Sequence, residues 1–186
     1  MKTTRTKDTP VSDVPLKIKA SATSERTFLE AYGGIYEHSP WVAKGAWTAR
    51  DGSNLDTVGG LHGAMEVTVA AADEASQLKL IGAHPDLAGK LAVAGELTAA
   101  SRSEQTGAGL DRCTKQEFEE FQNLNSAYKE KFGFPFIIAV KGHDRHSILK
   151  AFRTRLPNDR AIERETALQE INRIGHFRLM ELVENS

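Results

Sequence analysis

The sequence is poor in cysteine and in net charge, and each shortage excludes a class of protein. Cys113 is the only cysteine among 186 residues, which excludes an intrachain disulfide and any metal or iron–sulfur site built from several cysteines. The 24 Lys and Arg residues nearly balance the 25 Asp and Glu residues, giving a formal net charge of −1. A chain of this charge offers no field that grips a phosphate backbone, so nucleic acid is not an expected partner.

Long apolar runs are also missing. No stretch reaches the roughly 20 apolar residues that a membrane-spanning helix needs, so no membrane partner is expected. Residues 1–19 contain no apolar core of the kind found in a signal peptide. The last three residues, 184–186, do not form a peroxisomal signal of the Ser-Lys-Leu type. A cytoplasmic protein is the resulting expectation.

The composition changes once along the chain. Residues 1–22 mix Thr, Lys, Asp, Pro and Ser with few large apolar groups, and such a segment cannot offset its ordering entropy by burial. We therefore predict a mobile N-terminal arm over residues 1–22. With 40% hydrophobic residues in the whole sequence, the remaining residues 23–186 are sufficient for one domain with a single core.

Apolar residues recur at helical spacing through most of residues 23–186. Helices are expected from Thr23, from Leu55 to about Ala72, from Thr114 to Phe132, from His146 to about Arg155 and from about Arg160 to Val183. Thr114 and Glu117 match a capping box, and Gly133 suits a C-terminal cap, so both ends of that helix are marked. Residues 45–54 are expected to form a loop.

One segment departs from the helical pattern. Residues 134–142 are apolar and β-branched and are bounded by Pro135 and Gly142, which is typical of a short buried extended segment. It is the only strong strand signal in the sequence, so it has no obvious sheet to join. The sequence therefore predicts an all-α fold, a single-domain helical bundle with one short buried extended segment at about residues 136–140.

His84 and Glu104 are the candidate acid–base pair. Histidine titrates near physiological pH, and a carboxylate can orient or charge it. Each residue also has a simpler explanation, because a histidine before Pro85 is often a turn residue and Ser101 with Glu104 fits a capping box. Gln105 would project near Ser101 and can offer a donor and an acceptor to a planar ligand rich in amides. The residues alone leave both interpretations open.

Two other polar motifs resemble a phosphate-binding loop and a metal site, but neither matches the pattern that such a site requires. Six residues separate Gly82 from Gly89, where a phosphate-binding loop has four, and Leu91 replaces its Ser or Thr. Residues 143–146 contain two histidines and an aspartate, but no matching His or Cys cluster lies nearby in the sequence. A solvated loop is therefore expected there, not a metal site.

Four motifs in order resemble those of the 2-oxo-4-hydroxy-4-carboxy-5-ureidoimidazoline (OHCU) decarboxylases, the last enzymes of the route from urate to (S)-allantoin. They are Glu37-His38-Ser39-Pro40-Trp41, His84-Pro85-Asp86-Leu87, Ser101-x-x-Glu104-Gln105 with Ala108-Gly109-Leu110, and Phe132-Gly133-Phe134-Pro135-Phe136-Ile137-Ile138. The likeness covers about residues 28–183. Each motif alone is weak, whereas all four at the family's spacing are specific.

The resemblance implies an all-helical, cofactor-free and usually dimeric decarboxylase of purine catabolism that acts on a small ureidoimidazoline substrate. It assigns His84 as the proton donor and Glu104 as the second catalytic residue. The implied substrate-binding residues are Pro85, Ser101, Glu104, Gln105, Phe136, Ile137, Ile138, Ala139, Val140 and Arg178. Arg173 and Arg155 are alternatives to Arg178, because the match in the C-terminal helix rests on helix pattern alone.

Two other function classes stay open. A non-enzymatic binding module that kept the fold would not need His84, Glu104 and Gln105. A different ureide enzyme, such as an allantoin-cleaving amidohydrolase, would want metal ligands or an activated nucleophile, and the sequence displays neither. Activity on freshly generated intermediate discriminates against the first class, and sensitivity to chelators identifies the second.

Overall fold

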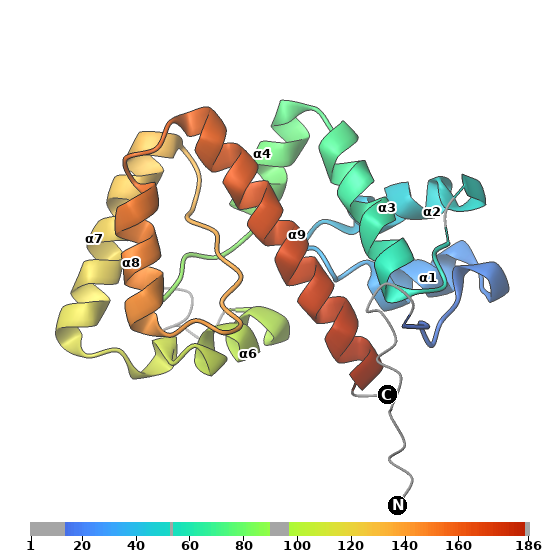
Figure 1. Cartoon of the computed structure of the whole chain (residues 1–186), viewed down its shortest axis with the longest axis horizontal. Helices are drawn as coiled ribbons and strands as arrows, with labels where there is room; N and C mark the ends of the chain where they lie inside the picture. The colour runs from blue at the N-terminus through green and yellow to red at the C-terminus, as the bar shows by residue number, and fades with distance from the viewer. Residues whose placement is uncertain (1–13, 53, 90–96, 185–186) are drawn as a thin grey trace, which may run out of the picture. The chain divides into compact units, whose positions relative to one another are not determined.

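A computed structural model of the chain describes residues 14–52, 54–89 and 97–184. Within these ranges the regular structure consists of eight α-helices and three short 3-10 helices, and the only β-type pairing is an isolated bridge between Pro15 and Thr57. The all-α prediction is therefore confirmed (Figure 1). None of the helices in the described ranges is long and apolar enough to cross a membrane.

The chain groups into two compact units. Unit 1 comprises Met1–Ala71 together with Gly175–Ser186, and unit 2 comprises Ala72–Ile174. Unit 1 is thus assembled from the two ends of the chain. The long helix α9, Arg160–Glu184, contributes its first part to unit 2 and its last part to unit 1.

Unit 1 is built on three further helices, which are α1 (Glu25–Tyr32), α2 (Pro40–Thr48) and α3 (Val58–Ala71). The side chain of Ser24 caps α1 by accepting from the N–H of Thr27. The ring of Phe28 lies 5.0 Å from those of Tyr32 and Trp47, measured between centroids. All three rings are buried, so α1 and α2 share an aromatic core.

The expectation of a loop at residues 45–54 is wrong for its first part. Residues 45–48 belong to α2, and a 3-10 turn follows at Arg50–Gly52. Pro40 begins α2, because proline fits the first helical position, where its missing N–H is not needed. Val42, Ala46 and Trp47 then form a buried face that stabilises the helix.

Residues 14–22 of the predicted arm contact the body of unit 1. The N–H of Leu16 donates to the carbonyl of Asp56, and the N–H of Val58 donates to the carbonyl of Val14, both at 2.8 Å. The Leu16 side chain is buried. Residues 1–13 lie outside the described residues, so the arm and its boundary at residue 22 stay a prediction.

Unit 2 contains α4 (Glu74–Gly82), α6 (Ala99–Gly107), α7 (Lys115–Phe132), α8 (Arg145–Arg155) and the first part of α9. The capping box of Thr114 and Glu117 and the left-handed cap at Gly133, with φ of 78°, are confirmed at the two ends of α7. The chain then runs as a non-helical segment over residues 134–140, followed by a turn that leads into α8 (Figure 1). The Phe136 ring stacks on Phe152 of α8 with centroids 3.7 Å apart, which fixes the segment to the helix.

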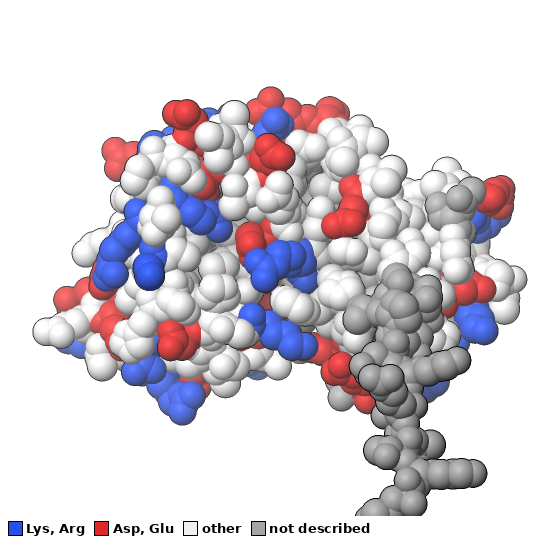
Figure 2. Space-filling model, viewed as in Figure 1, with Lys and Arg blue, Asp and Glu red and all other residues white. Residues whose placement is uncertain are grey.

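Charged side chains of both signs are intermixed on the molecular face in Figure 2. Pairs between exposed side chains, such as Arg26 with Glu30, contribute little to stability. Two ion pairs among the described residues are largely buried, namely Arg155 with Glu163 and Arg178 with Glu37. Breaking either of these two pairs should lower the stability more than breaking an exposed pair, because it leaves a buried charge without its partner.

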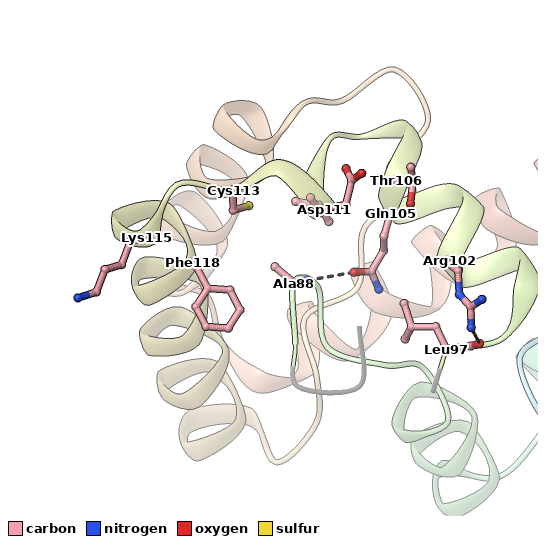
Figure 3. Close-up of a pocket in the computed structure, with 10 residues that line it drawn as sticks. Ala88, Leu97, Arg102, Gln105, Thr106, Asp111, Cys113, Lys115 and Phe118 are labelled. Carbon is pink, nitrogen blue, oxygen red and sulfur yellow. Dashed lines mark hydrogen bonds between the residues drawn. The ribbon is translucent and has the colours of Figure 1, made fainter. Parts of the chain in front are cut away.

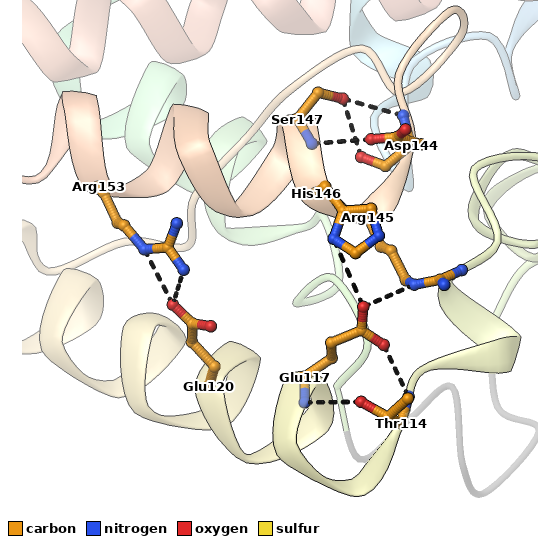
Figure 4. A network of polar contacts seen from close by, with 8 residues as sticks. All are labelled: Thr114, Glu117, Glu120, Asp144, Arg145, His146, Ser147 and Arg153. Atoms are coloured by element: carbon orange, nitrogen blue, oxygen red, sulfur yellow. Dashed lines mark hydrogen bonds and ion pairs between the residues drawn. The ribbon is translucent and has the colours of Figure 1, made fainter.

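A polar network joins the starts of α7 and α8 (Figure 4). Glu117 accepts from the N–H of Thr114 at 2.8 Å and from Nε of Arg145 at 2.7 Å. Asp144 caps α8 by accepting from the N–H of Ser147. The expected loop at residues 143–146 is wrong for its second half, because Arg145 and His146 begin α8, while Asp144 is the N-cap of that helix.

The same network predicts a pH dependence of stability. The N–H of Thr114, and after it the Arg145 guanidinium, lower the pKa of Glu117 from 4.5 to about 2. Because the folded-state pKa is the lower one, ionised Glu117 stabilises the fold above its unfolded pKa, and this contribution is lost as the pH falls toward about 2. Between about pH 6 and pH 2.5, Tm of the Glu117→Gln variant should therefore fall less than Tm of the unmodified chain. An equal fall of Tm in the two proteins over this pH range, measured by thermal unfolding, would contradict this prediction.

Candidate active site

The helix that carries Ser101, Glu104 and Gln105 begins earlier than a capping box at Ser101 would require. Helix α6 starts at Ala99, and its N-cap is Thr98, whose side chain accepts from the N–H of Ser101 at 3.2 Å. The predicted capping box of Ser101 and Glu104 is therefore wrong. Glu104 therefore lies inside α6 and does not act as the capping-box glutamate of that helix. Ser101 and Gln105, one turn apart, are both buried.

His84 follows the end of α4 and is 8% exposed. Its Nδ1 lies 3.0 Å from the carbonyl oxygen of Leu80. A carbonyl only accepts, so Nδ1 carries the hydrogen, and in the neutral ring the other nitrogen, Nε2, holds the lone pair. The Nε2 atom is buried. Nε2 is therefore the atom through which His84 gains or gives a proton.

Side-chain amides of α6 and α7 hold the turn after His84. The N–H of Ala88, a residue in the left-handed region with φ of 49°, donates to Oε1 of Gln105 at 3.0 Å (Figure 3). Gln122 donates to the carbonyl of Ala88, and Asn125 donates to the carbonyl of Leu87, each at 2.9 Å. Left-handed backbone is uncommon outside glycine and persists where the surroundings fix it. Three side-chain hydrogen bonds therefore hold the turn in this conformation.

The predicted catalytic residues and most of the predicted binding residues surround one cavity in unit 2. Its lining comprises His84, Pro85, Leu87, Ser101, Glu104, Gln105, Phe136, Ile137, Ile138, Val140 and Ile174. The structure thus brings residues from four separate stretches of sequence together, three of which contain predicted site residues. The free volume is only ≈ 30 Å³, so a ring-sized ligand requires the cavity to widen.

A larger cavity of ≈ 660 Å³ lies beside it and shares Gln105 (Figure 3). Its other lining residues are Ala88, Leu97, Arg102, Thr106, Leu110, Asp111, Cys113, Lys115 and Phe118. None of these is a predicted site residue. Size alone does not identify a site, so we assign the candidate site to the smaller cavity, which holds a titratable pair beside a non-helical backbone.

Arg178 lies in unit 1, in the last part of α9. Its Nη1 donates to Oε2 of Glu37 at 2.8 Å and to the carbonyl of Ile35 at 3.2 Å. A substrate-binding role for Arg178 stays a prediction. Of the two alternatives, Arg173 is 54% exposed and pairs with Glu170, whereas Arg155 is mostly buried behind the non-helical segment.

Two residues that sequence reasoning did not place behind the segment contact its backbone. Arg155 donates to the carbonyl of Ile137, and Glu170 accepts from the N–H of Ala139, each at 2.7 Å. Ala139, a predicted binding residue, therefore directs its N–H to Glu170. The sequence offered no signal for Glu170, because nothing local shows that a glutamate on a long polar helix reaches a backbone amide 31 positions away.

No group of three or more His, Cys, Asp or Glu side chains that can hold a metal ion occurs in the described part of the chain. The polar groups of the candidate site are instead one imidazole, one carboxylate, one hydroxyl and one amide, set beside apolar side chains. Such a site can orient a planar polar ligand by hydrogen bonds and exchange a proton with it.

Comparisons with known proteins agree with this arrangement. The chain is 45% identical over 155 residues to a 2-oxo-4-hydroxy-4-carboxy-5-ureidoimidazoline decarboxylase of Halalkalicoccus jeotgali, covering 83% of this chain and 84% of that one. It is 41% identical to the uric acid degradation bifunctional protein PucL of Bacillus subtilis, covering 85% of this chain and 31% of that one. The crystal structure of an (S)-allantoin synthase matches with a TM-score of 0.70 and 28% identity, covering 89% of this chain and 54% of that chain.

The family model for OHCU decarboxylase matches residues 21–180. That range contains the whole cavity with His84 and Glu104. The chain belongs to the OHCU decarboxylase family.

Proposed function

We propose that the protein decarboxylates 2-oxo-4-hydroxy-4-carboxy-5-ureidoimidazoline to (S)-allantoin in urate degradation, without a cofactor. The observation that supports this most is the shared cavity of His84, Glu104 and the segment 136–140. The membership of the family and the names of the relatives point to the same reaction. His84 can act as the acid, Glu104 provides a carboxylate, and the segment 136–140 provides backbone donors and acceptors for the substrate.

The substrate is a five-membered ring with a carboxylate, a hydroxyl and a ureido arm. It is planar in part and rich in N–H and C=O groups, so recognition depends on matched donors and acceptors. Ser101 and Gln105 supply side-chain groups, Pro85 shapes the turn, and the backbone of Phe136 to Val140 supplies peptide groups. Exclusion of water by Ile138 and Ile174, which line the cavity, strengthens each of these hydrogen bonds.

Decarboxylation breaks the bond between the ring and the carboxylate, and carbon dioxide leaves. The electron pair moves into the adjacent C=N bond of the ring, whose nitrogen takes a proton from solvent, and an enol results. The enol hydroxyl then gives its proton to Glu104 or to solvent as it becomes the carbonyl of allantoin, and a proton adds to the carbon that becomes the stereocentre. Protonated His84 delivers this proton from Nε2 to one face of the ring and is then recharged from solvent. Its Nδ1 bond to Leu80 fixes the ring orientation, which selects the face.

Glu104 acts on the substrate hydroxyl or on the imidazolium of His84, since a carboxylate can accept from either. Arg178 clamps an anionic group of the substrate. Both roles are part of the proposal. By resemblance to the family we also propose a homodimer, a cytoplasmic location, and a domain beginning near residue 23 after an N-terminal arm.

The function is tested with substrate generated in place by urate oxidase and the hydrolase that follows it. Circular dichroism in the allantoin band then reports the rate and the handedness of the product. We expect a faster rise of the signal of a single enantiomer than in the absence of the protein. Faster decay of the intermediate to racemic product would remove the stereochemical role of His84, and no acceleration would favour a non-enzymatic binding module.

The same assay tests the amidohydrolase alternative. Preincubation with a chelator is expected to leave the rate unchanged, because none of the proposed steps uses a metal. A loss of activity that returns with added zinc or manganese would instead identify a metal-dependent ureide hydrolase.

A further inference from the structure

Two mostly buried side chains hold the backbone of the segment 136–140. Arg155 at the end of α8 donates to the carbonyl of Ile137, and Glu170 of α9 accepts from the N–H of Ala139. In an extended chain the N–H and C=O of one residue point to one edge, and those of the next residue point to the opposite edge. Bonds at Ile137 and Ala139 therefore fix one edge of the segment.

The backbone groups of Ile138 consequently point to the other edge. Among the described residues no hydrogen bond to the N–H or C=O of Ile138 is observed, although the residue is only 7% exposed. Ile138 also lines the cavity with His84 and Glu104. Buried peptide groups without a protein partner are rare, and they mark positions where a ligand or water completes the hydrogen bonding.

Arg155 is itself held firmly. Its guanidinium bonds to Glu163, which is 0% exposed, at 2.9 Å, and it lies 4.4 Å from the centre of the Phe136 ring. Glu163 also accepts from Asn158 at 2.7 Å and from the hydroxyl of Tyr128. Burial, and after it the bond to Glu163, raise the pKa of Tyr128, so its hydroxyl stays a donor. A buried network with every member bonded is rigid.

We propose that Arg155 and Glu170 are positioning residues that hold Ile137 and Ala139 so that the N–H and C=O of Ile138 bind the substrate. This inference rests on the proposed function. The donor and acceptor of Ile138 match an adjacent N–H and C=O of the ring or ureido arm, as two residues pair across an antiparallel ladder. Neither Arg155 nor Glu170 touches the substrate, and both act through the backbone.

Glu170→Ala is the main test, because the side chain is partly exposed and its loss leaves the core intact. We expect KM to rise about tenfold, the value of about one hydrogen bond, with a much smaller change in kcat. Glu170→Gln keeps an oxygen that accepts from Ala139 and should restore KM to within about threefold. Glu165→Ala, an exposed change on the same helix, is the matched control and should leave KM unchanged.

Amide hydrogen exchange, followed by NMR, gives a second measurement that does not need the substrate. The amide of Ala139 should exchange faster in Glu170→Ala and should be protected again in Glu170→Gln. An unchanged KM together with faster exchange at Ala139 would overturn the positioning role. An inactive unmodified protein would instead overturn the proposed function, so the two failures are distinguishable.

Arg155 is tested with lysine, because removal of its charge leaves Glu163 buried without a cation and the variant can fail to fold. Lysine retains the charge beside Glu163 but lacks the planar fork that also reaches the carbonyl of Ile137. We expect Arg155→Lys to fold and to show a KM raised about tenfold. A folded Arg155→Lys protein with the KM of the unmodified chain would count against the role of Arg155.

Discussion

The His84→Asn variant is expected to lose activity by a factor of about 10²–10⁴, the usual contribution of a positioned general acid. Asparagine is similar in size and can still donate to the carbonyl of Leu80, so the turn after α4 should keep its conformation. It cannot deliver a proton to carbon. The measurement is kcat from circular dichroism of the allantoin formed, with far-ultraviolet dichroism as the check on folding.

A matched histidine serves as the control. His146 is 67% exposed at the start of α8, where its ring lies 3.5 Å from Glu117. His146→Asn should leave kcat within about twofold of the unmodified protein, because exposed substitutions away from a site have small effects. Near-normal kcat in a folded His84→Asn protein would refute the assignment of His84 as the proton donor.

The Arg178→Met variant is expected to lower the free energy of unfolding by about 3–5 kcal/mol. Glu37 and Arg178 are only 3% and 6% exposed, and methionine leaves the Glu37 carboxylate buried without the guanidinium. The carbonyl of Ile35 also loses a donor. Urea denaturation at neutral pH measures the change.

The comparison for this change is Arg173→Met on the same helix. Arg173 is 54% exposed and pairs with Glu170 across three positions, so its loss should cost less than about 1 kcal/mol. If Arg178→Met also cost less than about 1 kcal/mol, the pair with Glu37 would not stabilise unit 1. Arg178 would then be better explained by its proposed contact with the substrate.

The parts of the fold that the sequence predicted are those with local signals at both ends. Thr114 and Glu117 start α7 and Gly133 ends it, all within a few residues of the helix ends. The start of α2 was missed because Pro40 serves equally as a helix breaker and as a first helical residue. Thr98 was overlooked because Ser101 offered a second plausible cap three positions later.

In the candidate site, too, the sequence predicted the residues that belong to local motifs but not the contacts that support them. His84, Ser101 and Glu104 come from compact motifs, so the sequence identified them, and the structure places them around one cavity. The contacts that support them are distant in the sequence. Asn125 reaches Leu87 across 38 positions, and Glu170 reaches Ala139 across 31. Such pairs depend on the packing of whole helices, which no local pattern reveals.

The division of α9 between the two units sets an order of events during synthesis. Residues 72–174, which form unit 2, are one continuous stretch of the chain. Residues 14–71 are made before unit 2, whereas the other part of unit 1, residues 175–184, is made after it. Until Arg178 is made, the buried carboxylate of Glu37 lacks its guanidinium partner, so the part of unit 1 that precedes unit 2 cannot complete its buried ion pair during synthesis.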